Sequence, residues 1–524
     1  MIPSSVVKAY LTRPLDSHTW IKKLSEKELD AAIAALRPVP QLYPKLRMHQ
    51  KASFLLGVAY PQFCFWLDMG SGKTLLALEL LRYWFKLDKL RRAIIFVTSD
   101  KAFSSWTAQL KRFKIDLPLV TLEGSSEDKW QQLAEAQDGL ALLPYPGAIF
   151  MASSKGKNKK GKTVLKLDKK KLQRLLAWAD GFVLDESTRA SGDSLTFDLI
   201  SQLSKTATVR YALAGRPFGR DPITLWAQHY LIDGGETLGE TKGLFREAFY
   251  TAKKNHWGNK YSFDYTFDKT MQPELARMIQ NRSITYTADE CIDLPKVVSI
   301  REVVSLPEEA GAYYQRVIDG IISAKGNFRA MKNAFMRLRQ LSSGFLGAVN
   351  DETGERIEVA FDENPKMDRL LELLDELPEG KKAVVFYEFT FSGRTLVKRL
   401  KTELGIDSIW LWSGTKDSLK EQRRFEDRNG PAVAVIQSRV GAYSLDWLQR
   451  VASYSAFYES PLSSIDREQA ERRLIRDGQL HTVFQYDMIT KNTADERILA
   501  FHREGGDLFD ALLRNPAKTL GFKL

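Results

Sequence analysis

Cysteine is scarce in this chain, and long apolar runs are absent. Only Cys64 and Cys291 occur among 524 residues. They lie far apart in apolar surroundings, so we predict two buried free thiols in a reducing compartment, with no disulfide and no structural zinc. No apolar run reaches the ~18 residues that a membrane-spanning helix needs. The first residues also lack the layout of a secretion signal. We therefore expect a cytoplasmic protein that does not bind membranes.

The charge balance favours a polyanionic partner. The chain has a formal net charge of +12 and a pI of about 9.3. This excess alone determines neither fold nor function. The apolar fraction of 44% and the 28 phenylalanines predict large folded cores, and the length predicts about three domains. No fixed-period repeat is present, and we expect a monomer.

The pattern of apolar runs predicts two α/β lobes. Short apolar runs alternate with helical patterns over residues 45–232 and again over 346–500, which is typical of parallel sheets. The segment 233–345 predicts a mostly helical insertion, and 1–44 and 501–524 predict helical extensions. The predicted buried strands are residues 93–98, 148–151, 181–184, 209–213, 383–387, 432–436 and 483–486.

A glycine-rich loop follows an apolar run that ends at Leu67 and precedes an apolar-periodic helix. Its residues are Met69, Gly70, Ser71, Gly72, Lys73 and Thr74. Glycines let backbone N–H groups face a phosphate, the lysine can contact the terminal phosphates, and the threonine hydroxyl can hold Mg²⁺. The loop therefore predicts a site that binds a nucleoside triphosphate. It does not indicate for which process the energy of the nucleotide is used.

Two carboxylates end the predicted strand 181–184. Asp185 is placed to hold Mg²⁺ beside Thr74, and Glu186 to orient or deprotonate the attacking water. Hydrolysis needs both groups because a metal-bound carboxylate is a poor base. The alternative is a surface Asp-Glu pair that caps the next helix.

An arginine-rich segment lies in the second predicted lobe. Arg473 and Arg476 are three residues apart, so a helix would place them on one face. Arginine suits the charge on a transferring phosphoryl group, and Gln469 precedes the pair. If these arginines act on the same nucleotide, ATP lies between the two lobes and its hydrolysis can drive motion. The alternative is a solvated basic helix.

Two further segments carry weaker signals. Arg47 and Gln50 precede the glycine-rich loop by some twenty residues, and the glutamine amide could recognise the adenine edge. The basic stretch within 155–171, with Lys157, Lys159 and Lys160, predicts either a solvated hairpin tip or a finger that touches nucleic-acid phosphates.

Together these motifs resemble superfamily 2 helicases, and most closely the Swi/Snf-type DNA translocase branch in a compact, phage-like form. Residues 469–479 match the Gln-Ala-x-x-Arg-x-x-Arg-x-Gly-Gln motif of that branch, and the resemblance spans about residues 45–500 in the expected order. It implies two RecA-like lobes in tandem, ATP and Mg²⁺ as cofactors, and DNA, double-stranded or branched, as partner.

The resemblance also assigns roles to individual positions. Thr98, Lys101, Ser413 and Gly414 would contact the nucleic-acid backbone, and Arg216 would couple hydrolysis to that contact. Three further segments match motifs of the branch: Leu338–Leu341, Pro365–Met367 and Thr493–Ile498.

The sequence departs from the family pattern at three places. Thr188 stands where many members have histidine, and Arg216 replaces a small hydroxyl residue. Residues 438–447 form a loose version of the Gly-rich motif V, with Asp446 and Trp447 as unusual residues.

These features predict an ATP-dependent motor that moves along duplex DNA, for branch migration, fork remodelling or clearing of bound proteins. A bacterial or phage-infected cell is the expected setting. The second hypothesis is a strand-separating DNA or RNA helicase, for which Trp106, Trp412 and Trp447 are the candidates to stack bases. A position in the buried core is the favoured interpretation of each of these tryptophans. An ATP-gated scaffold with little turnover is the third hypothesis, and a small-molecule kinase the fourth.

Overall fold

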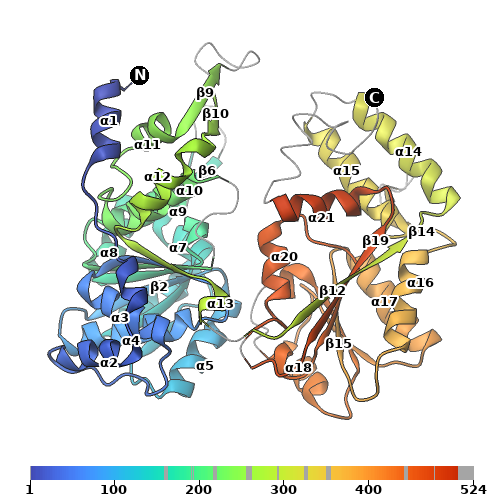
Figure 1. Cartoon of the computed structure of the whole chain (residues 1–524), viewed down its shortest axis with the longest axis horizontal. Coiled ribbons are helices and arrows are strands. Elements are labelled where there is room, and N and C mark those ends of the chain that lie inside the picture. The colour runs from blue at the N-terminus through green and yellow to red at the C-terminus, as the bar shows by residue number, and fades with distance from the viewer. Residues whose placement is uncertain are drawn as a thin grey trace. The chain divides into compact units, whose positions relative to one another are not determined.

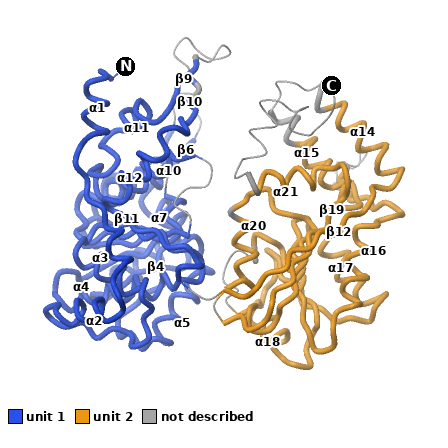
Figure 2. The backbone as a smooth tube through the Cα atoms, in the orientation of Figure 1, with its two compact units in different colours: residues 1–292 blue, residues 293–524 orange. Residues whose placement is uncertain are grey.

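The computed structural model divides into two compact units, residues 1–292 and 293–524 (Figure 2). It describes residues 2–157, 163–190, 192, 194–215, 221–254, 263–291, 294–323, 328–349, 356–441, 447–476 and 478–504. No helix in this part of the chain combines the length and hydropathy needed to cross a membrane.

Unit 1 is built on a seven-stranded parallel sheet with the order β11-β1-β8-β7-β2-β4-β3 (Figure 1). Every neighbouring pair in this sheet is parallel. Its strands are β1 (Gln62–Leu67), β2 (Arg92–Val97), β3 (Leu119–Thr121), β4 (Gly139–Pro144), β7 (Gly181–Asp185), β8 (Val209–Ala214) and β11 (Ser283–Tyr286).

Helices cover both faces of this sheet, as the apolar strands require. Cys64 and Trp66 on β1 face one core, which includes side chains from α6 (Ser126–Glu135), α7 (Tyr145–Ala152), α8 (Lys169–Trp178), α9 (Leu195–Leu203) and α10 (Ile223–Asp233). On the other face, α3 (Met48–Ala59) and α4 (Lys73–Lys86) pack together. There the Tyr211 hydroxyl donates to Gly57 O at 2.7 Å and accepts from Trp84 Nε1 at 2.6 Å.

The remaining elements of unit 1 are shorter. Its other helices are α1 (Ser4–Thr12), α2 (Glu26–Ala35), α5 (Phe103–Phe113), α11 (Lys242–Phe249), α12 (Gln272–Ile279) and α13 (Ala288–Cys291), with 3₁₀ turns at Thr19–Lys23, Asp100–Ala102, Ser187–Ala190 and Lys269–Met271. Two antiparallel hairpins, β5 (Ser153–Lys157) with β6 (Thr163–Leu167) and β9 (Tyr250–Lys254) with β10 (Phe263–Phe267), stand apart from the sheet.

Unit 2 has a six-stranded parallel sheet with the order β12-β19-β18-β15-β17-β16. Its strands are β12 (Val297–Val304), β15 (Ala383–Tyr387), β16 (Ser408–Leu411), β17 (Val433–Gln437), β18 (Tyr454–Phe457) and β19 (Val483–Thr490). A separate hairpin joins β13 (Phe345–Val349) to β14 (Arg356–Ala360).

Two apolar cores flank the sheet of unit 2. One includes α16 (Pro365–Asp375) and α17 (Thr390–Glu403), and the other includes α18 (Ser418–Glu426) and α20 (Ser464–Glu471). A third cluster joins α14 (Glu308–Ser323), α15 (Phe328–Ser342) and α21 (Ala494–Glu504). The short helices α19 (Ser438–Gly441) and η5 (Leu448–Arg450) complete the unit.

The prediction of two parallel-sheet lobes is confirmed, and so are six of the seven predicted strands. The strand predicted at 148–151 is wrong, because those residues belong to helix α7. Ala148, Met151 and Ala152 are buried at helical spacing while Phe150 is 58% exposed. The strand is the preceding run 139–144, which ends where Pro144 caps the helix.

The segment predicted as one mostly helical insertion, 233–345, differs in the structure. The boundary between the units falls within it, at 292/293. It contributes β11 to one large sheet and β12 to the other. Residues of β12 alternate between exposed and half-buried. The sequence of this edge strand has no continuous apolar run from which the strand could be predicted. In the predicted N-terminal extension, the capping box of Ser25 and Glu28 starts α2. In the predicted C-terminal extension, residues 505–524 lie outside the described residues.

Both cysteines are buried free thiols, as predicted. Burial raises the pKa of Cys64 and of Cys291, so both remain protonated at neutral pH. Among the described residues, no group of three or more His, Cys, Asp or Glu side chains has the arrangement of a metal site.

Candidate functional site

The glycine-rich loop connects β1 to α4, as predicted. Gly70 and Gly72 have φ values of 81° and 83°, in the left-handed region that favours glycine. Gly72 is the residue immediately before α4, and a Cβ atom there would collide with the amide nitrogen of Gln50. Both glycines are therefore required by the backbone path itself.

Buried polar side chains hold the loop from behind. His49 Nε2 lies 2.8 Å from Ser71 O, and Gln50 Nε2 donates to Ser71 O and Gly72 O, each at 3.3 Å. The same glutamine accepts from Arg47 N at 3.0 Å through Oε1. His49 and Gln50 are each only 4% exposed. Contacts within the protein therefore shape the loop.

Asp68 and Ser71 close the loop on its other side. Asp68 Oδ1 accepts from Met69 N at 2.7 Å and Oδ2 from Ala288 N at 3.2 Å, which ties the loop to α13. Ser71 Oγ donates to Asp68 O at 2.7 Å. Lys73 Nζ donates to Leu67 O at 2.9 Å and Asp68 O at 3.4 Å. These two contacts hold the Lys73 ammonium group beside the end of β1, where the loop begins.

The acidic pair lies at the carboxyl end of β7. Because β7 and β1 both pair with β8 in parallel, their carboxyl ends meet at one edge of the sheet. Asp185 Oδ2 accepts from Trp106 Nε1 at 3.1 Å, and Asp185 O accepts from the Tyr145 hydroxyl at 2.9 Å. Glu186 follows with a φ of 50°, in the left-handed region, which is costly for a residue other than glycine.

The electrostatics of the pair agree with its position. Burial raises the pKa of Asp185 to about 6, and the neighbouring Glu186 adds to this rise. The hydrogen bond from Trp106 and the charge of Lys73 act in the opposite direction. A divalent cation would favour the ionised carboxylate in the same way.

The donors available at this edge fit Mg²⁺. Thr74 supplies a hydroxyl at the start of α4, and Asp185 supplies a carboxylate from β7. Both are hard oxygen donors, and Mg²⁺ typically takes one or two such protein ligands together with phosphate and water.

A third loop of the site follows β8. Its Gly215 packs near Met69, with the ideal Cβ position 3.5 Å from Met69 Cγ and 3.7 Å from Met69 N. The residue after β8 therefore lies against the phosphate loop. Arg216, the predicted coupling residue, lies outside the described residues.

The predicted nucleic-acid contacts are dispersed over both units. In unit 1, Thr98 is half-buried after β2, and Lys101 and Lys157 are exposed. Lys159 and Lys160 lie outside the described residues. In unit 2, Ser413 and Gly414 are exposed just after β16, and Ser413 N donates to Gln437 Oε1 at 3.3 Å.

The arginine pair of unit 2 is not helical, so that part of the prediction is wrong. Helix α20 ends at Glu471, and residues 472–476 form turns. Arg473 is 6% exposed and Arg476 is half-buried. Gln469 lies in the last turn of the helix, with its Oε1 buried and without a hydrogen-bond partner in the described part of the chain. The motif therefore combines a helix end and a turn.

Sequence reasoning missed Arg467, which anchors this helix. Its guanidinium donates to Glu471 Oε1 at 2.7 Å and to Ser460 Oγ at 3.0 Å, and pairs with Asp487 Oδ1 at 2.7 Å. It also lies 3.4 Å over the Phe457 ring. Its position six residues before Arg473 within an arginine-rich motif was the available signal. Burial does not distinguish Arg467 from Arg473, because the two are 5% and 6% exposed, so only the contacts of Arg467 in the folded chain identify it as the anchor.

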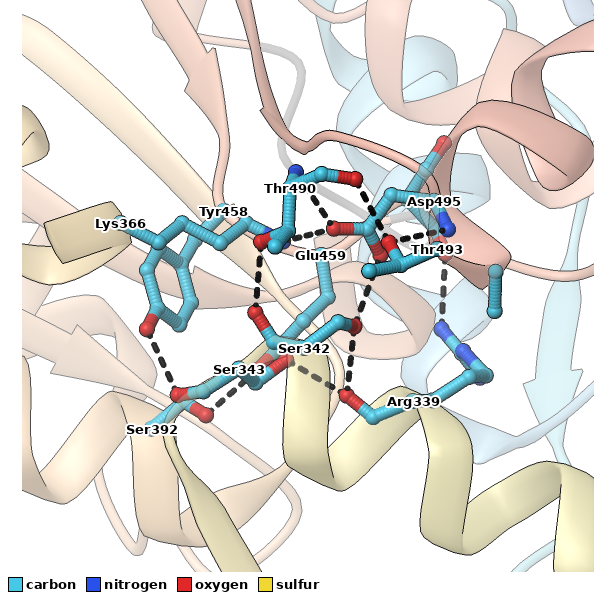
Figure 3. A network of polar contacts seen from close by, with 12 residues as sticks. Arg339, Ser342, Ser343, Lys366, Ser392, Tyr458, Glu459, Thr490, Thr493 and Asp495 are labelled. Carbon is cyan, nitrogen blue, oxygen red and sulfur yellow. Dashed lines mark hydrogen bonds and ion pairs between the residues drawn. The ribbon is translucent and has the colours of Figure 1, made fainter. Parts of the chain in front are cut away.

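Three distant motifs of unit 2 converge on one buried polar network (Figure 3). The Lys366 ammonium pairs with Asp495 Oδ2 at 2.7 Å, and their side chains are 2% and 10% exposed. Ser342 Oγ bonds to Asp495 Oδ1 at 3.1 Å and to Arg339 O at 3.0 Å. Arg339 in turn donates to Ser460 O at 2.8 Å. The network joins α15, α16 and α21 to the loop that precedes α20.

Known proteins with sequences similar to this chain include an ATP-dependent helicase. No protein-family model matches the chain. An uncharacterised ATP-dependent helicase of Mycoplasma genitalium is 20% identical over 457 residues, which cover 84% of this chain and 39% of that protein. The transcription regulatory protein SNF2 of Saccharomyces cerevisiae is 20% identical over 457 residues, covering 82% of this chain and 25% of that protein. The predicted resemblance to the Swi/Snf-type branch of superfamily 2 is confirmed.

Among solved structures, the chain is similar to the SWI2/SNF2 ATPase core of Sulfolobus solfataricus in complex with double-stranded DNA, at 18% identity and a TM-score of 0.39. The match covers 93% of this chain and 99% of that chain. The present chain thus spans 39% and 25% of the length of these two curated relatives, the Mycoplasma genitalium helicase and SNF2.

The contacts of Gln50 generate a first prediction. Its amide nitrogen donates to two carbonyl oxygens of the loop and its amide oxygen accepts from Arg47 N, so we expect Gln50→Ala to lower the affinities for ATP and GTP by the same factor. Competition of fluorescent nucleotide analogues measures both affinities. A loss confined to ATP would instead show that Gln50 recognises adenine, as the sequence suggests.

The buried pair of unit 2 generates a second prediction. Lys366→Met leaves the Asp495 charge buried and unpaired, so we expect it to destabilise unit 2 by about 3–5 kcal/mol. Adding Asp495→Asn removes that charge and should restore part of the loss. Urea denaturation of the single and double variants measures the difference.

The exposed pair of Lys22 and Glu290, with side chains 27% and 43% exposed, is the matched control. Lys22→Met should cost under about 1 kcal/mol. Equal costs for Lys366→Met and Lys22→Met would contradict the importance of burial.

Proposed function

We propose that the chain is an ATP-driven motor that moves along duplex DNA. The observation that carries this proposal is the meeting of the phosphate loop, Asp185 and Glu186 at the carboxyl edge of one parallel sheet. A second parallel-sheet lobe with its own arginine motif supports a motor over a simple phosphotransferase, because motion requires two bodies.

Each residue has a chemical role in this proposal. The backbone N–H groups of residues 70–74 and the Lys73 ammonium bind the phosphates. Glu186 orients the attacking water and takes its proton. Thr74 and Asp185 would hold Mg²⁺, which would supply positive charge beside the phosphoryl oxygens. Arg473 and Arg476 stabilise the remaining charge from unit 2.

The DNA partner rests on charge and on the relatives. A net charge of +12 suits binding through phosphates, which is independent of sequence and sensitive to salt. Thr98, Lys101, Ser413 and Gly414 are the proposed backbone contacts. Branch migration, fork remodelling and removal of bound proteins are all compatible tasks for such a motor.

The strand-separating alternative loses most of its stacking candidates. Trp106 and Trp447 are 2% and 4% exposed, so neither ring is accessible to a base. Trp412 is half-buried and stacks on Trp410 at 5.2 Å between ring centroids. A helicase mechanism would need another stacking surface.

The central test is ATP hydrolysis with duplex, forked and single-stranded DNA and with RNA in parallel. We expect duplex DNA to stimulate hydrolysis, and Lys73→Ala and Glu186→Gln each to lower kcat by about 100-fold or more, because each removes a group used in the transition state. Lys89→Ala, an exposed lysine beyond the end of α4, is the control and should retain full activity.

Two outcomes would overturn the proposal. Hydrolysis by Lys73→Ala at the parent rate would exclude the proposed site. A parental rate that no nucleic acid increases would favour an ATP-gated scaffold. Triplex displacement measured beside strand displacement then separates translocation from unwinding.

The β5–β6 hairpin generates a further prediction. Lys155 and Lys157 are exposed on it, so we expect Lys155→Glu/Lys157→Glu to weaken DNA binding. The slope of log affinity against log salt should fall by about 0.9 for each phosphate that the hairpin no longer neutralises. Lys398→Glu/Lys401→Glu, an exposed pair on α17 with the same charge change, should leave the slope unchanged. Equal slopes for both variants would assign the hairpin to a solvated surface.

A further inference from the structure

The β9–β10 hairpin of unit 1 extends away from the large sheet (Figure 1). It joins α11 to the 3₁₀ turn before α12 and contributes to neither large sheet. Its sequence is rich in aromatic and basic residues, with Lys253, Lys254 and Lys260 against the single acidic residue Asp264. Neither the ATP site nor the family motifs make use of it.

The register of the hairpin gathers its aromatic side chains on one face. Tyr250 pairs with Phe267, Ala252 with Tyr265, and Lys254 with Phe263. Directly opposed residues of an antiparallel pair share a face, and alternate pairs share the same face. Tyr250, Phe263, Tyr265 and Phe267 therefore form one aromatic row that runs outward along the hairpin.

Core packing explains only the inner half of this row. Tyr250 and Phe267 are partly buried against the cluster that includes Phe245 and Phe249, and their rings meet at 5.6 Å and 72°. Farther out, Tyr265 is 42% exposed and Phe263 is 47% exposed. The aromatic row thus continues past the end of the core that would account for it.

A cation accompanies the outer half. The Arg246 guanidinium lies 4.7 Å from the centre of the Tyr265 ring, whereas Lys253 is exposed on the opposite face of the hairpin, where its register partner is Asp264. Exposed rings beside the Arg246 guanidinium match a ligand that combines flat aromatic faces with negative charge. Nucleic acid has both, whereas an apolar protein surface would not require the cation.

We propose that Phe263 and Tyr265, with Arg246, form a stacking surface for unpaired nucleic-acid bases. Duplex DNA hides the faces of its bases, so the surface selects single-stranded, frayed or forked segments. Stacking is tolerant of sequence because every base has a π-face. The surface deepens the proposed function, on which it rests, by adding a contact with unpaired strands to a motor on duplex DNA.

The experiment uses the full chain and an oligonucleotide carrying 2-aminopurine in a single-stranded segment. Stacking on an aromatic ring changes 2-aminopurine fluorescence, so binding and stacking are read together. We expect Phe263→Ala/Tyr265→Ala to weaken binding of single-stranded DNA by about 5- to 150-fold for each base that no longer stacks. The fluorescence change should disappear as well.

Two further variants isolate stacking from packing. Phe263→Tyr/Tyr265→Phe keeps both rings and should retain affinity and fluorescence change. Trp20→Ala removes another exposed aromatic of unit 1, 56% exposed, and should have no effect. Circular dichroism confirms that each variant is folded, and duplex-stimulated ATP hydrolysis by Phe263→Ala/Tyr265→Ala should stay near the parent rate.

Specific outcomes would overturn the inference. Unchanged affinity and fluorescence in Phe263→Ala/Tyr265→Ala would show that no base stacks there. Loss of a concentration-dependent dimer in that variant, with DNA binding intact, would assign the face to a second copy of the chain. If the parent binds single-stranded DNA through these rings but duplex DNA fails to stimulate hydrolysis, the proposed motor is wrong while the stacking surface stands.

Discussion

Parallel strand pairing is the constraint on which the candidate site depends. In a parallel sheet every strand ends at the same edge, so loops far apart in the sequence meet there. This brings the phosphate loop after β1, the acidic pair after β7 and Gly215 after β8 to one place in unit 1. In unit 2 the same geometry gathers the loops that follow β15, β17 and β18.

Buried polar contacts then determine the shape of these loops. In unit 1, His49, Gln50 and Asp68 hold the phosphate loop through its backbone. In unit 2, the pair of Lys366 and Asp495 joins α16 to α21, and Asp495 also accepts from Thr490 N at the end of β19. A buried polar group without a partner is costly, so each network tolerates few arrangements. In both units, these contacts therefore fix the positions of the segments that they join.

Sequence reasoning succeeded where the local signal was strong. Glycines at left-handed positions, a lysine at a helix start and carboxylates at a strand end identified the loop and the acidic pair. It failed where burial decides the outcome. The edge strand β12 lacks an apolar run, residues 148–151 are apolar within a helix, and Arg473 follows a helix end that the arginine spacing does not reveal.

The class of chemistry follows from the local sequence, because phosphate binding and water activation need particular residue types in a fixed local order. The two parallel-sheet lobes follow from it as well, through alternating apolar runs. The anchoring contacts of Arg467, the inaccessible rings of Trp106 and Trp447, and the exposed aromatic residues of the β9–β10 hairpin become apparent in the folded chain alone. These properties depend on contacts between segments far apart in the chain.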